Sequence, residues 1–257
     1  MPPRIPTEAD FALLSPDLQL ALHFPSPRES TTAFLILLHG LGDSEAPFAH
    51  FARGMALPGV LAISVRGTAA LPSALLSDGG EHARQGGHFH WGDDLTFDSR
   101  TGGIDPDPGF ERARRAVVDR LIGQVLVDRC GWDLSDVILF GFGQGGSLAL
   151  GLASQLRGAD RVVDVTDADG RGDKAFKGVV SIGGPLPLSM VPTTSARDKS
   201  DTKALVCQLD EDLVDAVRAE IRDVTVVRWK RNDIAMPRDR DEMYPIMKFL
   251  ADRLRTV

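Results

Sequence analysis

The segment from residue 137 to residue 153 limits the possible folds more than any other part of the chain. An apolar run, Val137–Phe140, leads into the glycine-rich stretch 141–146, which is followed by Ser147–Ala153. A short apolar run before glycines is typical of a buried strand, and we predict strand, tight turn and helix. By itself, the pattern fits a phosphate-binding or dinucleotide-binding turn as well as a catalytic one.

A second strand-to-loop pattern lies upstream. The apolar run Phe34–Leu38 predicts a buried strand, and it continues into His39-Gly40-Leu41-Gly42-Asp43. Glycines in such a loop let the backbone approach a reacting carbonyl group, so the N–H groups of Leu41 and Gln144 could stabilise an oxyanion together. The alternative is a strand end that turns through glycines, with His39 held by backbone hydrogen bonds, and this segment alone leaves both open.

Taken in order, several motifs resemble those of the phospholipase/carboxylesterase family of α/β-hydrolases, which includes the acyl-protein thioesterases. The family turn has the form GFSQGG, where this chain has Gly141-Phe142-Gly143-Gln144-Gly145-Gly146. The other matching segments are Leu37–Asp43, His90–Asp93, Val180–Gly184 and Leu205–Val214. The resemblance implies one α/β-hydrolase domain over residues 1–257, with a mostly parallel central sheet and helices on both faces. It also implies hydrolysis of acyl esters or thioesters.

The catalytic triad that the resemblance implies is incomplete. The nucleophile position is Gly143, which has no side chain, and the acid position is Asp212. The histidine position, near Asp233, is unfilled, and no histidine follows His90. Serine chemistry needs a base that takes the hydroxyl proton and returns it to the leaving group. Binding and an oxyanion hole alone leave about 10³–10⁴-fold acceleration over water.

The resemblance assigns further residues to the site without giving them proton-transfer roles. Leu41 and Gln144 fall at the oxyanion hole, and His39, Trp91 and Asp93 fall at the pocket. We expect no cofactor.

Three other side chains are candidates for a replacement nucleophile. Ser147 lies one helical turn beyond Gly143, a position recessed from the tip of the turn, and we favour an ordinary first-turn serine there. Cys207 lies in an apolar run and is expected to be a buried small hydrophobe. Neither it nor Cys130 has a histidine nearby in sequence.

The remaining cluster of interest contains His82, His88 and His90, followed by Asp93 and Asp94. Such a set fits a zinc site for metal-dependent hydrolysis. We favour a structured loop at the pocket edge, because the segment is rich in glycine and the resemblance already accounts for its tryptophan. We therefore predict no metal.

Composition restricts the partners. The chain has 257 residues, 43% of them hydrophobic and 25% charged, which is typical of a globular protein with one sizeable core. A net charge of −7 and the absence of a basic run argue against nucleic acid as a partner. Neither a signal peptide nor a run of roughly 18 apolar residues is found, so we expect no integral membrane segment and a cytoplasmic location.

Strand and helix patterns alternate along the chain, which predicts a mostly parallel sheet. We expect an edge strand at Leu18–Phe24, a helix at Glu111–Cys130, and a last helix whose apolar face, methionines included, is core. Residues 66–110 are rich in Gly, Pro and Asp and predict a lid or pocket loop. Residues 157–175 predict a polar surface insertion.

Two functions from different classes remain. The residue chemistry favours a pseudoenzyme that binds an acyl ester or thioester, an acylated protein or a regulatory partner without turning it over. The alternative is an active ester or thioester hydrolase with a rearranged, substrate-assisted or metal-dependent site. Fold-level analogy favours the alternative.

Overall fold

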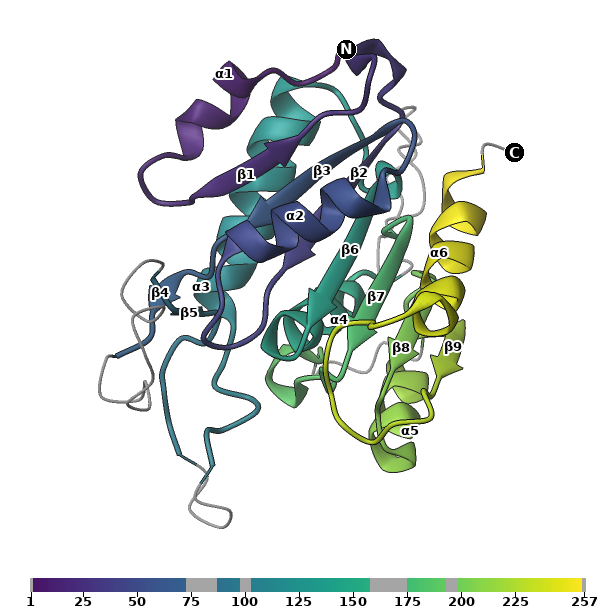
Figure 1. Cartoon of the computed structure of the whole chain (residues 1–257). Helices are drawn as coiled ribbons and strands as arrows, with labels where there is room; N and C mark the ends of the chain where they lie inside the picture. The colour runs from purple at the N-terminus through teal and green to yellow at the C-terminus, as the bar shows by residue number, and fades with distance from the viewer. Residues whose placement is uncertain (1, 73–86, 98–102, 158–174, 193–197, 256–257) are drawn as a thin grey trace.

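The structure, a computed structural model, describes residues 2–72, 87–97, 103–157, 175–192 and 198–255. Within these ranges the main sheet has seven strands in the order β1-β3-β2-β6-β7-β8-β9 (Figure 1). The strands are β1 Leu20–His23, β2 Ala33–Leu38, β3 Val60–Val65, β6 Val137–Phe142, β7 Gly178–Ile182, β8 Ala204–Cys207 and β9 Val224–Val227. The edge strand β1 is antiparallel to β3, and the other neighbouring strands are parallel. A separate two-stranded pair joins β4 Ala69–Ala70 to β5 Phe89–His90.

Helices connect and cover the strands. The longer ones are α2 Glu45–Met55, the continuous pair α3 Glu111–Arg114 and η5 Arg115–Arg129, α4 Gln144–Gln155, α5 Glu211–Glu220 and α6 Arg240–Leu254. Single turns occur at α1 Glu8–Phe11, η1 Ala12–Leu14, η2 Arg28–Ser30, η6 Leu134–Asp136 and η7 Leu188–Met190.

The two faces of the sheet carry separate apolar clusters. On β2, Leu35 and Leu37 join the cluster that contains buried residues of α2 and α6. Phe34, Ile36 and Leu38 point the other way and join the cluster built with η5, α4 and α5. Successive side chains of a strand point to opposite faces, so a strand covered on both sides is apolar throughout. Figure 1 shows α2 and α6 in front of the sheet and α4 behind it.

Two predicted elements differ in detail from those observed. The predicted helix at Glu111–Cys130 is present, but from Arg115 its hydrogen bonds reach five residues back, as from Cys130 N to Val125 O at 3.1 Å. This wider turn still places its apolar residues toward the sheet. In α6, Met243 and Met247 are only half-buried and pack against the edge of the core, because they face a groove rather than the sheet.

The parallel register decides where the loops meet. Leu38, the last residue of β2, pairs with Gly141 of β6, so the segments that follow these two strands leave the sheet side by side. Gly183 follows β7 at the same edge, since Phe142 pairs with Ile182. Functional sites of open α/β sheets lie outside the carboxyl ends of the strands, and this edge is the place to look for one.

The two irregular stretches predicted from the sequence are only partly described. Two parts of the predicted lid region lie outside the described residues, namely 73–86 and 98–102. Most of the predicted insertion also lies outside them, at residues 158–174. In the part of the chain that is described, no helix combines the length and apolarity needed to cross a membrane.

Candidate active site

The turn between β6 and α4 has an unusual backbone at Gly143. Its φ is 51° and its ψ −122°, a left-handed conformation that L residues rarely adopt. A Cβ placed on Gly143 would meet only Gly40 Cα, at 3.9 Å, among the described residues. Sharp, strained strand-to-helix turns of this kind expose a nucleophile in hydrolases. The turn here therefore has the shape and the room for a side chain that the sequence does not provide.

The residues predicted to form an oxyanion hole meet at one pocket. Leu41, Gly143, Gln144 and Ser147 line a cavity of about 180 Å³. Among the described residues, the backbone N–H groups of Leu41 and Gln144 donate to no protein acceptor. The Gln144 side chain is held away from them, since its Oε1 accepts a hydrogen bond from the Trp91 backbone N–H at 2.8 Å. Two N–H groups are thus available to an oxygen atom in this pocket.

The three residues predicted at the pocket lie behind or beside it rather than in its wall. His39 is fully buried, its Nε2 accepts from Gly67 N–H at 2.8 Å, and its Nδ1 therefore donates to Gly40 O at 2.7 Å. Burial lowers the pKa of His39, which favours this neutral ring. The buried Trp91 indole donates to His39 O at 2.8 Å. Asp93 instead accepts from the N–H groups of Glu111 and Arg112, at the start of α3.

Neither the predicted acid position nor the predicted base position lines the pocket. Asp212 lies exposed in the first turn of α5 and is not among the residues that line the pocket. Asp233 is exposed and pairs with Arg231, at 3.0 Å, and with Arg238. The neighbouring Ile234 is 52% exposed and packs against Gly183, a pocket residue, since its Cγ2 would lie 2.1 Å from a Cβ placed there. An aliphatic side chain therefore borders the pocket at Gly183.

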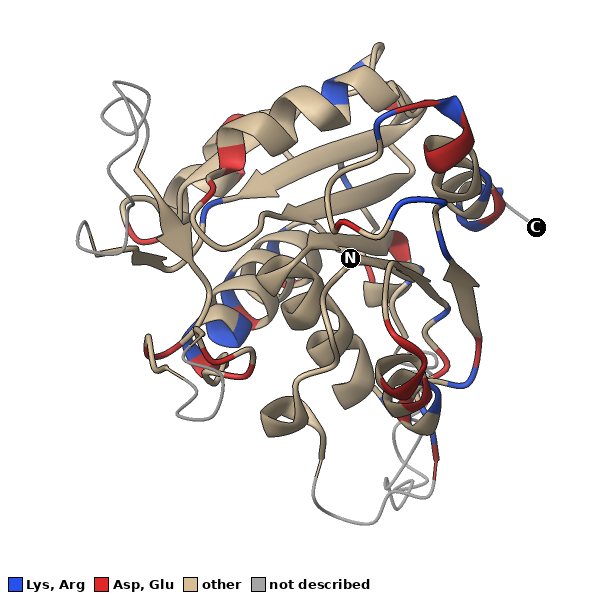
Figure 2. Ribbon diagram, turned by 60° about the horizontal axis from the view of Figure 1, so that its bottom comes forward, with Lys and Arg blue, Asp and Glu red and all other residues tan. Residues whose placement is uncertain are grey.

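A network centred on Arg231 holds the loop that carries Ile234. The Arg231 guanidinium donates to Glu242 at 2.7 Å and to the carbonyl oxygens of Asp233, Ala235 and Met236 at 3.1, 3.2 and 3.0 Å. Gln208 ties the same loop to β8 through Arg231 O at 2.8 Å and Trp229 N–H at 2.6 Å. Figure 2 shows acidic and basic segments side by side near the C-terminus.

Of the three alternative nucleophiles, Ser147 lines the pocket, whereas Cys207 and Cys130 do not. Ser147 is buried, lines the pocket, and donates its backbone N–H to Gly143 O at 3.0 Å. Cys207 is buried in β8, and burial raises the pKa of its thiol to about 12, so it is an inert small hydrophobe. Cys130 is likewise buried and unpaired.

The histidine-rich segment forms no metal site within the described residues. There, no group of three or more His, Cys, Asp or Glu side chains could hold a metal ion. His88 Nδ1 lies 2.5 Å from Gly42 O, and burial lowers the pKa of His90. The third member of the predicted cluster, His82, lies outside the described residues.

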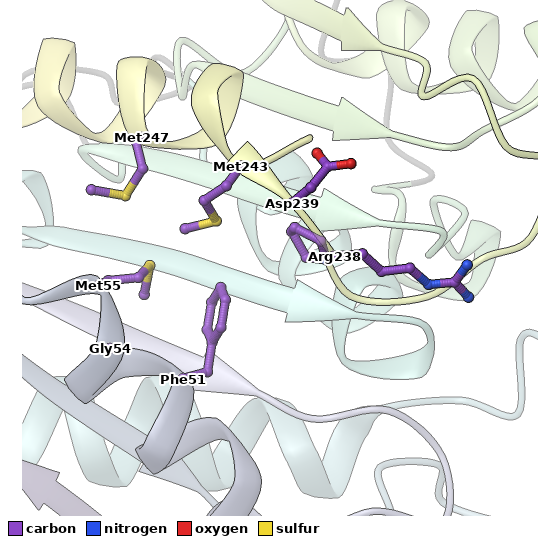
Figure 3. Close-up of a pocket in the computed structure, with 8 residues that line it drawn as sticks. Phe51, Gly54, Met55, Arg238, Asp239, Met243 and Met247 are labelled. Atoms are coloured by element: carbon purple, nitrogen blue, oxygen red, sulfur yellow. The ribbon is translucent and has the colours of Figure 1, made fainter. Parts of the chain in front are cut away.

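A larger cavity, of about 410 Å³, lies away from the predicted site residues (Figure 3). In this groove Phe51 and Met55 of α2 face Met243 and Met247 of α6, while the Arg238 side chain extends away from them. The groove contains none of the residues around Gly143, so its size does not make it the candidate active site.

Several pocket residues were not identified from the sequence. Ile104, Asp105 and Pro106 line the cavity from within the predicted lid region, and Gly183 and Pro185 line it from the end of β7. They line the same cavity as Gly143, and in the sequence only the length of the 66–110 segment pointed to the first three.

Comparisons with known proteins agree with this architecture. Residues 22–166, more than half of the chain, match the phospholipase/carboxylesterase family. An uncharacterized hydrolase of Schizosaccharomyces pombe is 29% identical over 229 residues, covering 86% of this chain and 83% of the relative. Zea mays acyl-protein thioesterase 2 matches with a TM-score of 0.59 and 19% identity, over 92% of this chain and 99% of its own. A Bacillus cereus carboxylesterase matches with a TM-score of 0.57 and 14% identity, over 96% and 100%. The predicted α/β-hydrolase fold is confirmed.

Proposed function

Because the chain belongs to the phospholipase/carboxylesterase family, we propose that it binds an acyl ligand in the pocket at Gly143 and has little or no serine-type turnover. The observation that carries the proposal is the turn itself. It keeps the strained backbone and the N–H groups of Leu41 and Gln144, which have no acceptor in the described part of the chain, yet residue 143 has no side chain to act as a nucleophile. Such a pocket can hold a carbonyl oxygen without attacking the carbon attached to it.

The absent base supports the same proposal. Serine attack needs a group of near-neutral pKa within hydrogen-bond reach of the nucleophile. Ile234 cannot transfer a proton, and Asp233 is engaged by two arginines. Partial desolvation raises the pKa of Asp233, but the hydrogen bond from Arg231 and the charges of Arg231 and Arg238 lower it further, which makes that carboxylate a still weaker base. A nucleophile supplied by a substitution would therefore lack its partner.

We propose that the ligand is an acyl ester, a thioester or an acylated protein segment, in keeping with the reactions of the family. Asp212 corresponds in sequence to the acid of the family triad, and in this proposal it has no catalytic role. The two buried, unpaired cysteines suit a reducing compartment, and we propose that the protein acts in the cytoplasm.

The test measures hydrolysis of 4-nitrophenyl butyrate and S-octanoyl-N-acetylcysteamine between pH 6 and 9, together with ligand-observed NMR of the thioester. We expect the unmodified protein to bind the thioester and to hydrolyse both compounds at background rates. Turnover within about three orders of magnitude of a working esterase would overturn the proposal, because an oxyanion hole and binding alone supply only about 10³–10⁴-fold. Background rates without binding would overturn it as well.

Two double variants examine the position of the missing base. Gly143→Ser with Ile234→His replaces the side chain that packs against Gly183 at the pocket, whereas Gly143→Ser with Asp233→His replaces a side chain paired with Arg231 and Arg238. We expect hydrolysis to appear in the first and to be weaker in the second, the matched control. Circular dichroism checks the fold of each, because a serine at positive φ costs about 1–3 kcal/mol.

A further inference from the structure

The pocket at Gly143 offers more hydrogen-bond donors than two backbone groups. Ser147, on the first turn of α4, is only 2% exposed and belongs to the pocket wall. Within the described part of the chain its hydroxyl has no hydrogen-bond partner, and its Oγ is not one of the fully enclosed unpaired atoms. A buried hydroxyl in a cavity wall that has no partner in the protein indicates a polar ligand there.

The number of donors indicates the chemistry of that ligand. An ester or thioester presents a single carbonyl oxygen, which the N–H groups of Leu41 and Gln144 already satisfy. A carboxylate presents two oxygens with about four acceptor sites, and it can use the Ser147 hydroxyl as well. Hydrogen bonds to an ionised acceptor are roughly twice as strong as neutral ones.

The local field favours a negative head group. Gln144 begins a helix of 12 residues, whose N-terminal N–H groups and dipole point positive charge at the cavity. The missing side chain at Gly143 leaves room beside these donors, since a Cβ there would have one neighbour within 4 Å among the described residues. The second oxygen of a carboxylate fits the space that a serine oxygen would otherwise take.

One charge opposes this binding. Asp105 lines the pocket and is half-exposed, and its carboxylate accepts from the Asp107 N–H at 2.8 Å and more weakly from Thr96 Oγ1 at 3.4 Å. Water and salt screen an exposed charge, so Asp105 weakens the binding of an anion without abolishing it. The rest of the wall is apolar, formed by Leu41, Ile104, Pro106 and Pro185, with Ile234 over Gly183. Such a wall suits an aliphatic tail.

From these observations we propose that the pocket is a receptor for a free aliphatic carboxylic acid, held through its ionised carboxylate by Leu41 N–H, Gln144 N–H and the Ser147 hydroxyl. The inference rests on the proposed binding function and specifies the ligand as the acid rather than its ester.

Isothermal titration with octanoate, methyl octanoate and octanol, at pH 7.5 and low salt, tests the head group. We expect octanoate to bind at least tenfold more tightly than the other two, because they lack a charged acceptor. Equal or tighter binding of methyl octanoate would overturn the carboxylate assignment and leave the binding function intact. Failure of all three to bind would overturn the carboxylate assignment, and the ligand-observed NMR of the thioester then decides whether the binding function stands.

Three variants test the geometry. Ser147→Ala should weaken octanoate about tenfold and leave octanol unchanged. Ser154→Ala is the matched control, since this buried serine of the same helix donates to Gly151 O at 2.8 Å and does not line the pocket. Asp105→Asn should strengthen octanoate about fivefold, because a repelling charge is removed, and leave methyl octanoate unchanged. An octanoate affinity that neither Ser147→Ala nor Asp105→Asn changes would overturn the proposal, and a thermal melt checks the fold of each variant.

Discussion

Gly143 and Gly145 lie two residues apart in one turn, but different requirements explain them. At Gly145 a Cβ would lie 2.2 Å from Leu38 O, so the start of α4 can pack on the end of β2 only if this residue has no side chain. At Gly143 there is room for a side chain, and only the backbone conformation disfavours one. Gly145 is a packing requirement, whereas Gly143 marks the absence of a nucleophile.

This difference gives a prediction for single residues. Gly145→Ala should lower the free energy of unfolding by about 2 kcal/mol, because the clash involves backbone on both sides. Gly54→Ala, in the exposed last turn of α2, should raise it by about 0.5–1 kcal/mol, since nothing lies within 4 Å of the new methyl group and alanine favours helix. Urea unfolding followed by circular dichroism measures both. Equal effects of the two substitutions would contradict the packing argument.

At the scale of elements, the connection from β9 to α6 is shaped by one side chain. The Arg231 guanidinium bonds to three carbonyl oxygens of its own loop and to Glu242 of α6, which is why the loop needs no regular structure. The same contacts fix Ile234 against Gly183. A loop held by hydrogen bonds rather than by a buried apolar core opens locally when those bonds are removed.

We therefore expect Arg231→Ala to increase hydrogen–deuterium exchange across residues 232–237 by about tenfold or more, with little change in the strands β2 and β6. Arg238→Ala is the matched control, because Arg238 is exposed and its side chain bonds only to Asp233 among the described residues. Mass spectrometry of peptic peptides measures the exchange. Equal protection of the loop in both variants would show that Arg231 does not organise it.

The stability of the whole molecule should depend on pH through two buried groups. Burial lowers the pKa of His39, so the unfolded chain takes up a proton below about pH 6.5 that the folded chain does not. Arg4 above all, together with Thr7 and Arg129, lowers the pKa of Asp10, which fastens the N-terminal arm to η5. The Asp10 contribution is present above pH about 3.9 and is lost as the pH falls below it.

The expected outcome is a free energy of unfolding that begins to fall below pH 6.5, by at most about 1.4 kcal/mol per pH unit from His39. His39→Gln should have a lower free energy of unfolding at pH 7.5, because the hydrogen bonds to Gly67 and Gly40 change. Its free energy of unfolding should nevertheless fall less than that of the unmodified protein on acidification to pH 5. Urea titrations at half-unit steps of pH provide the comparison. Parallel pH curves for the two proteins would rule out His39 as the titrating group.

Much of the fold could be predicted from the sequence, because its patterns are local. The runs Phe34–Leu38 and Val137–Phe140 are strands, as predicted from short continuous apolar runs that lead into glycines. The missing nucleophile and base could also be read directly, because a side chain that is absent from the sequence cannot be supplied by folding. The Met243 and Met247 assignment was less successful, as helical spacing does not distinguish a core from the wall of a groove.

The sequence by itself determined the strands, the glycine turn and the absence of a serine and a histidine from the expected positions. Only the tertiary structure decided that Ile234 packs against Gly183 at the pocket, that Ser147 belongs to the pocket wall, and that the Asp93 carboxylate accepts hydrogen bonds at the start of a helix. These outcomes depend on which segments the parallel register brings together and on which partner a side chain finds there. Neither is encoded in the spacing of residues along the chain.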